Sequence, residues 1–173
     1  MKTVVIFSSK YGSTEKYAAL IAGELGADLR KASEIKPSRL REYDAVIFGG
    51  GLYAGSIRGA GFVKKNAEAL KGKRLAIFTV GMSNPTDKKY YQRIIDRNFD
   101  AGIRINSRFF HLRGGLDLAA LSPPHRLIIG ALKAASSLGK SKNADSDMLK
   151  ALDGTDFFDK SGIAPIVEYI SAP

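Results

Sequence analysis

Short apolar runs recur along the chain and are separated by polar stretches that carry apolar residues at helical spacing. A continuous run such as Val4 to Phe7 is typical of a strand whose two faces are both covered by helices, as in a parallel sheet. Each run therefore predicts a strand. The predicted strands cover residues 2–8, a weaker one at 27–32, 44–50, 74–81 and 103–114.

Helical patterns follow the predicted strands. From Ser13 to Leu25, apolar residues recur at helical spacing, and Glu15 lies in the first turn, where a carboxylate suits the helix dipole. Further helical stretches are predicted at a short piece near 35–42 and at 60–70, 87–101 and 157–171. This alternation predicts an α/β fold, a doubly wound five-stranded parallel sheet in the order 2-1-3-4-5. Such sheets bind ligands beyond the carboxyl ends of the first and third strands.

Length and composition set the broad class. The 173 residues, 45% of them hydrophobic, predict a single domain over residues 1–173. The chain has no cysteine and two histidines, so disulfides, thiolate chemistry and cysteine metal sites are excluded and no metal site is expected. The first strand begins at Lys2, and no apolar run approaches the ~20 residues of a membrane span, which predicts a cytoplasmic protein.

The formal charge of +10 predicts attraction to an anionic partner: nucleic acid, a membrane surface or an acidic small molecule. Half of this charge lies between Arg104 and Lys150, where eight Lys/Arg face three Asp. That region has no recognised nucleic-acid module and few aromatic residues between its cations beyond Phe109 and Phe110. A nucleic-acid partner is therefore not expected.

The loops after the first, third and fourth predicted strands should meet at one edge of the sheet. They read SSKYGST, GGGLYAGSIRG and TVGMSNP, and all are rich in Gly, Ser, Thr and Asn. The first combines hydroxyls, one cation and Gly12 at a helix start, which suits a phosphate, although Ser and Thr are also ordinary N-caps. In the second loop, Tyr53 predicts a stacking platform for a planar ligand, or an exposed ring packed on its neighbours.

The stretch Ser9-Lys10-Tyr11-Gly12-Ser13-Thr14 resembles the phosphate loop of flavodoxins, and it departs from that pattern at Tyr11, where they usually carry Thr. The resemblance of fold and loop positions covers nearly all the chain and implies a flavodoxin-like protein with FMN. It implies that the phosphate is held by Ser9, Lys10, Tyr11, Gly12, Ser13 and Thr14, and that the ring is flanked by Leu52, Tyr53, Ala54, Gly55, Thr79, Val80, Gly81, Met82, Ser83 and Asn84.

An insert at about residues 114–150, after or within the fifth strand, resembles that of the flavodoxin-like protoporphyrinogen dehydrogenases. That family implies FMN-dependent oxidation of a porphyrinogen, with a quinone as the electron acceptor. In that reading, Arg113 and Arg126 are candidate contacts for the substrate's carboxylates. No catalytic side chain is expected, because a flavin takes up hydride at its ring. Leu127, with its apolar and cationic neighbours, predicts a docked core helix or a helix bound peripherally at the inner face of a membrane.

Other functions stay open. A flavodoxin-type electron carrier without its own substrate is the main alternative, although a basic chain would repel the basic partners that acidic flavodoxins meet. A basic binding protein that shares only the fold is a further one. The G-x-G-x-x-A match at 49–54 follows the third strand, where a dinucleotide motif does not belong, and residues 7–10 lack the acidic residues of a receiver domain. His111 and His125 are given no catalytic role.

Overall fold

A computed structural model describes residues 1–84, 86–115, 127, 130, 131, 134 and 156–173. Five strands form a parallel sheet in the order β2-β1-β3-β5-β6. This confirms the predicted α/β fold and strand order. The strands are β1 (Thr3–Ser8), β2 (Asp28–Lys31), β3 (Ala45–Tyr53), β5 (Arg74–Gly81), β6 (Ser107–Arg113) and the short β4 (Ser56–Ile57), which pairs antiparallel with β3.

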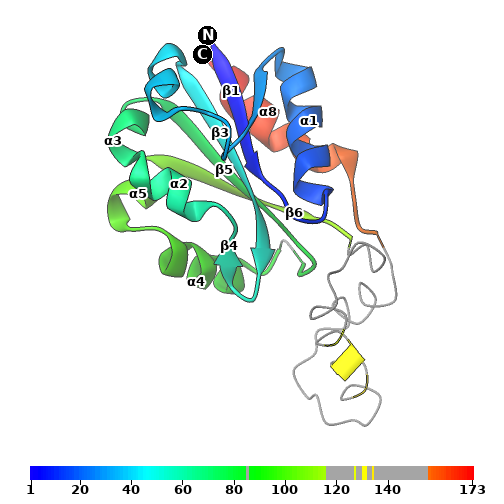
Figure 1. The fold of residues 1–173 in the computed structure, drawn as a ribbon. Helices are drawn as coiled ribbons and strands as arrows, with labels where there is room; N and C mark the ends of the chain where they lie inside the picture. Colours follow the sequence, from blue (N-terminus) through cyan, green and yellow to red (C-terminus); the bar gives the residue numbers. More distant parts are fainter. Residues whose placement is uncertain (85, 116–126, 128–129, 132–133, 135–155) are drawn as a thin grey trace.

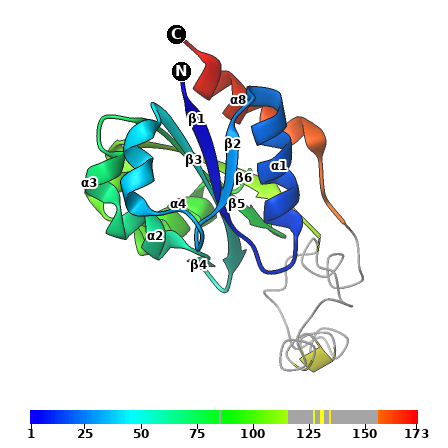
Figure 2. The ribbon, with the colours of Figure 1, turned by 45° about the horizontal axis from the view of Figure 1, so that its top comes forward.

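Helices cover both faces of the sheet (Figure 1). In β1, Val4 and Ile6 pack into one apolar cluster, whereas Val5 and Phe7 pack into the other, because successive strand residues point to opposite faces. Figure 2 shows α1 and α8 together on one face. The helical elements are α1 (Ser13–Leu25), η1 (Pro37–Glu42), α2 (Ala60–Lys65), α3 (Ala67–Leu70), α4 (Lys88–Asn98), α5 (Ala101–Ile105), η2 (Lys160–Ile163) and α8 (Ala164–Ser171).

Several predicted boundaries are wrong. The helix expected at 157–171 begins only at Ala164, after the 3₁₀ turn η2, and the helix expected at 87–101 ends at Asn98. Two further differences have a local cause. The strand expected at 103–114 begins at Ser107, because its first residues belong to α5, whose start is capped by the Asp100 carboxylate accepting from the N–H of Ile103 at 3.2 Å. The helix expected at 60–70 is divided into α2 and α3 at Asn66, whose side chain donates to the Phe62 carbonyl at 2.8 Å. In both places a polar side chain bonds the local backbone: Asp100 starts α5, and Asn66 lies where α2 ends.

The hairpin of β3 and β4 was not predicted. Its two turn residues, Ala54 and Gly55, have φ values of 47° and 77°, as a two-residue turn between antiparallel strands requires. Asn98 at the end of α4 holds this turn: its side-chain oxygen accepts from the N–H of Ile57 at 2.9 Å, and its amide donates to the Gly55 carbonyl at 2.9 Å. The end of β3 is therefore fixed to α4.

Tyr17 ties α1 to two other segments. Its ring is buried, and its hydroxyl donates to the Arg113 carbonyl at 2.7 Å and accepts from the Asp159 N–H at 2.9 Å. One phenol therefore joins α1, the end of β6 and the chain that leads into α8. None of the helices among the described residues is long and apolar enough to cross a membrane.

We predict that Tyr17→Phe lowers the free energy of unfolding by about 1–3 kcal/mol, because a partly buried carbonyl and a partly buried N–H both lose their partner. Urea unfolding followed by circular dichroism measures this change. Tyr43→Phe is the matched control, since the Tyr43 hydroxyl makes one hydrogen bond, at 2.7 Å to the carboxylate of Asp28, whose side chain keeps 41% of its surface exposed and so stays hydrated in the variant. Equal losses in the two variants would contradict the role given to Tyr17.

Candidate functional site

The carboxyl ends of four parallel strands meet at one edge of the sheet. The strand register aligns Ser8 with Gly50, Gly50 with Thr79, and Thr79 with His111. The chain beyond this row forms the three polar loops that were predicted from the sequence. The structure therefore brings together the loops that follow β1, β3 and β5.

The loop of residues 9–12 leads from β1 into α1 and leaves the helix start open. Gly12 is the N-cap residue, with φ 90° and no side-chain cap, and nothing within 4 Å would meet a Cβ built on it. The first helical bond joins the Lys16 N–H to the Gly12 carbonyl at 2.9 Å. The preceding N–H groups of α1 consequently have no intrahelical acceptor, which is the arrangement that binds an anion.

The loop hydroxyls are not equivalent. Ser13 Oγ donates its only proton to the Gly115 carbonyl at 3.2 Å, so this hydroxyl has no further hydrogen to give. Ser9 Oγ accepts from the Gly12 N–H at 3.1 Å and keeps its own proton for another acceptor. Thr14 Oγ1 makes no hydrogen bond with the part of the chain that the structure describes, and it would lie 3.4 Å from a Cβ on Gly51. The donor set therefore fits a phosphate.

Lys10 and Tyr11 lie on the outer part of this loop. The Lys10 ammonium is 5.2 Å from the centre of the Tyr11 ring, which is a cation–π contact. The tyrosine at the position where the resembled motif has threonine thus contacts the loop's one cation.

The other two loops lie against each other. A Cβ on Gly81 would come within 3.2 Å of Leu52 Cδ2, so the end of β5 packs closely on the end of β3. Beyond Leu52, the turn of Ala54 and Gly55 carries Tyr53, whose exposed fraction is 53%. The two predicted ring-side segments, 52–55 and 81–84, therefore meet at Leu52 and Gly81.

Within the predicted set, five residues belong to strands and not to a loop: Leu52 and Tyr53 in β3, and Thr79, Val80 and Gly81 in β5. Thr79 and Val80 lie inside β5, with exposed fractions of 0% and 5%. The Thr79 hydroxyl is 2.7 Å from His111 Nδ1 and is thus occupied within the sheet. Only the backbone of these two residues can take part in a site at this edge. Met82, Ser83 and Asn84 form the loop proper.

His111 and Tyr91 support that loop, a role that the sequence did not reveal. Their rings stack with centroids 3.6 Å apart, and the Tyr91 hydroxyl donates to the Ser83 carbonyl at 3.0 Å. Burial lowers the pKa of His111 to about 4 and raises the pKa of Tyr91, so both side chains are neutral near pH 7. The only sequence signal was that Tyr91 falls on the apolar face of α4.

Arg113 braces the same loop from β6. Its Nε and Nη2 donate to the Met82 carbonyl at 3.3 and 3.2 Å, and its guanidinium lies 3.8 Å from the centre of the Phe157 ring. The contact predicted between Arg113 and a substrate carboxylate stays a prediction. Arg126, the other predicted contact, lies outside the described residues, as do the apolar neighbours of Leu127 at 128, 129 and 132.

The described residues on either side of the segment 116–155, Gly115 and Asp156, lie beside the loop of residues 9–14. A Cβ on Gly115 would come within 2.6 Å of Asp156 Oδ1, so the two described residues that flank the segment are in contact. Gly115 also accepts the hydrogen bond from Ser13 at the start of α1. The segment between them therefore leaves and rejoins the fold next to the candidate site.

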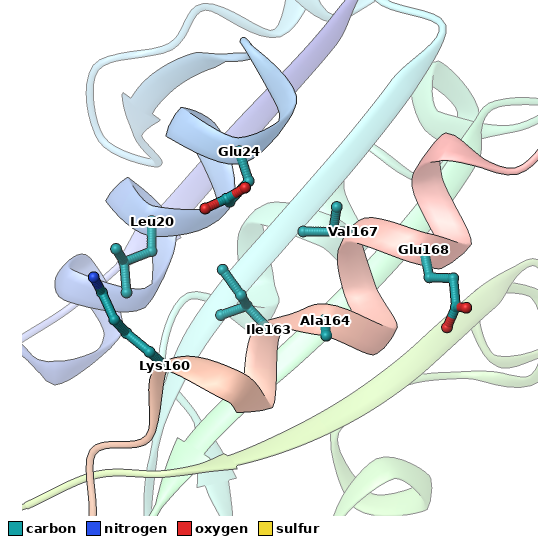
Figure 3. A pocket seen from close by; sticks show the side chains of 7 residues that line it. All are labelled: Leu20, Glu24, Lys160, Ile163, Ala164, Val167 and Glu168. Atoms are coloured by element: carbon teal, nitrogen blue, oxygen red, sulfur yellow. The ribbon is translucent and has the colours of Figure 1, made fainter.

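A groove of about 560 Å³ lies elsewhere, between α1 and α8, where Leu20 and Val167 face each other (Figure 3). Leu20 is two turns along α1 from the loop, and none of the predicted site residues lines this groove. Among the described residues, no group of three or more His, Asp or Glu could hold a metal ion. The carboxyl edge is therefore the stronger candidate.

Comparison with known proteins matches residues 4–144 to the Flavodoxin domain family. The chain is 27% identical over 128 residues to an uncharacterized protein of Methanocaldococcus jannaschii, covering 68% of this chain and 85% of that protein. It is 32% identical over 89 residues to protoporphyrinogen IX dehydrogenase (quinone) of Escherichia coli, covering 47% of this chain and 49% of the enzyme. The second similarity thus spans about half of each protein.

Solved structures with a similar arrangement include an oxidised flavodoxin 2 from Bacillus cereus, with a TM-score of 0.47 and 16% identity over 88% of this chain and 94% of that one. A flavodoxin from the domain Archaea has a TM-score of 0.46 and 17% identity over 69% of this chain and 89% of that one.

We predict that His111 makes the stability of the fold depend on pH. Its pKa of about 4 in the folded chain lies below the ordinary value of 6.5, so the unfolded chain binds the proton first as the pH falls. The stabilisation of the fold by neutral His111 is complete above about pH 6.5 and is lost progressively as the pH falls toward about pH 4. Urea unfolding at several pH values measures the free energy of unfolding of the parent chain and of His111→Asn. The difference between the two should change between about pH 6.5 and pH 4.

His125→Asn removes the other histidine and is the control. Its stability relative to the parent chain should not follow the same pH window. If the difference in the free energy of unfolding between His111→Asn and the parent chain stays constant with pH, the buried, neutral state of this ring is contradicted.

Proposed function

The chain belongs to the flavodoxin family, and from this premise we propose that it is an FMN-dependent oxidoreductase that oxidises a porphyrinogen and passes the electrons to a quinone. Family membership supports the flavin. The partial similarity to the E. coli enzyme supports the substrate and the acceptor. The fold alone would allow many functions, so each part of the proposal depends on the site.

The observation that carries the proposal is the open start of α1. Its free N–H groups, the spare proton of Ser9 and the uncommitted hydroxyl of Thr14 all lie at one end of the helix. These are the donors that a phosphate monoester needs, and the helix dipole adds to them. We assign the FMN phosphate to this loop, with Lys10 as the nearby cation and without Mg²⁺.

The ring of FMN would lie along the surface formed by residues 52–55 and 81–84. When bound, FMN supplies two-electron chemistry at its ring. Small residues and backbone N–H groups on this surface can approach a flat ring closely, and Tyr53 is the proposed stacking partner. Asn98 and Tyr91 act as positioning residues, because they hold the two loops by hydrogen bonds to backbone groups.

The substrate assignment depends on charge and on the position of the insert. A net charge of +10 favours a molecule with several carboxylates, such as a porphyrinogen. Because Gly115 and Asp156 lie together beside Ser13, a segment inserted between them starts next to the proposed cofactor. Arg113 and Arg126 remain the proposed carboxylate contacts. A membrane quinone as acceptor implies peripheral contact of the insert with the lipid surface.

A second candidate function is electron transfer between proteins, without a small-molecule substrate. The observation that favours it is the exposure of Tyr53, which leaves the proposed ring side accessible to a large partner. The two functions share the cofactor site and differ in the need for the insert.

We predict that Ser9→Ala combined with Thr14→Ala weakens FMN binding by roughly 1.5–3 kcal/mol for each hydrogen bond lost to the phosphate. Titration of the purified chain with FMN, followed by quenching of flavin fluorescence, measures the affinity. Ser13→Ala is the matched control in the same loop. It should retain most of the affinity, because the Ser13 hydroxyl already donates to Gly115. An unchanged affinity in the double variant would contradict the assignment.

We predict that deleting residues 118–142 leaves FMN binding intact but abolishes oxidation of a porphyrinogen with a soluble quinone, and with it association with liposomes. The deletion should be tolerated because the flanking residues Gly115 and Asp156 are already in contact. FMN titration of the shortened chain is the control for folding. Porphyrinogen oxidation at the parental rate would remove the insert from the reaction and favour the electron carrier.

A further inference from the structure

The outer face of α4 carries a row of cations. Lys89, Arg93 and Arg97 are spaced by four residues, so their side chains lie along one side of the helix. All are exposed, and none forms an ion pair within the part of the chain that the structure describes. Asp96 on the same helix does not neutralise them, because it is paired with Arg104.

The helix dipole does not account for the whole row. Lys89 lies in the first turn, where the positive end of the dipole disfavours cations, whereas Asp87 caps the helix start and Arg97 lies in the last turn, where a cation is favourable. Like charges four residues apart also repel each other. Pairing within α4 therefore does not explain why the three cations are aligned.

The row of cations ends beside residues 52–55, where the ring of FMN is proposed to lie. A Cβ on Gly55 would come within 3.2 Å of Arg97 Nη1, so the last cation packs against the turn beside Tyr53. The next residue, Asn98, bonds the same turn. Figure 1 shows α4 beside β4 at this end of the sheet. Arg58, directly after β4, adds another exposed cation to the same turn.

We propose that Lys89, Arg93 and Arg97, here called the α4 row, form the docking surface for an acidic protein. Complementary charge selects such a partner: the row is long, narrow and uncompensated, and it suits carboxylates on a protein surface. A lipid surface fits less well, because the apolar residues of α4, Tyr91, Ile94 and Ile95, are buried in the core and cannot enter a membrane.

This inference goes beyond the proposed function, because binding through the α4 row requires neither flavin nor porphyrinogen. It adds a protein partner and a place for it beside the turn that carries Tyr53. A protein docked there would cover the ring side of the proposed cofactor site. Loss of FMN binding and loss of docking are separate results, so one can fail without the other.

The test uses a plant-type ferredoxin as an acidic protein probe and cytochrome c as a basic control. Surface plasmon resonance at low ionic strength should show that the chain binds ferredoxin and not cytochrome c. The triple variant Lys89→Gln/Arg93→Gln/Arg97→Gln should lose about tenfold or more of the affinity, and added salt should weaken binding of the parent chain.

The matched control is Lys36→Gln/Arg41→Gln/Lys71→Gln. These three exposed cations belong neither to α4 nor to the turn between β3 and β4, while the change in net charge is the same. Affinity retained in this control supports the α4 row. Equal losses in both triple variants would mean that net charge alone drives binding and would overturn the proposal, as would failure of the parent chain to bind ferredoxin.

Vesicles containing phosphatidylserine form a second arm of the experiment. The triple variant of the α4 row and the parent chain should bind these vesicles equally. If vesicle binding instead depends on the α4 row and ferredoxin binding does not, the surface is a membrane contact and the protein partner is wrong.

Discussion

Close approach of the backbone at the carboxyl edge of the sheet is the constraint on which the candidate site depends. A Cβ on Gly49 would lie 2.2 Å from the Phe78 ring, one on Gly50 would lie 2.6 Å from the Arg58 carbonyl, and one on Gly114 would lie 2.7 Å from Val80. No larger residue fits at these positions without a shift of its neighbours. Glycine allows β3, β5 and β6 to end side by side, and this brings their loops to the start of α1.

The same edge shows what hydrophobic patterning predicts and what it leaves out. The continuous apolar runs predicted the strands, and the loop positions followed from the parallel order. The extension of β3 beyond residue 50 was not predicted from the pattern. Gly51 is held in the sheet by pairing with Val80 of β5, and Leu52 and Tyr53 are held by the two-residue β4, which the pattern did not reveal. The breaks at Asn66 and before α5 depend on single hydrogen bonds, which no periodicity reveals.

Within the site, residue type showed which loops carry hydroxyl groups, but not which of these hydroxyls are already bonded within the chain. The assignment of a phosphate to residues 9–14 stays a prediction. Thr79 and Ser13 carry the same groups, yet their hydroxyls bond His111 and Gly115. The support of the 82–84 loop by Tyr91 and Arg113 comes from residues far apart in the chain. Contacts of this kind, from side chains that support a loop without belonging to it, depend on tertiary structure, and the sequence pattern therefore did not reveal them.

The central claim is that the open start of α1 binds a phosphate, and comparison of FMN with riboflavin tests it most directly. Riboflavin has the same ring without the phosphate group. Titration of the purified chain with each ligand should show FMN binding tighter by about tenfold or more, as expected from one or more charge-assisted hydrogen bonds. Equal affinity for FMN and riboflavin would contradict the account, because the loop at residues 9–14 would then contribute nothing to recognition.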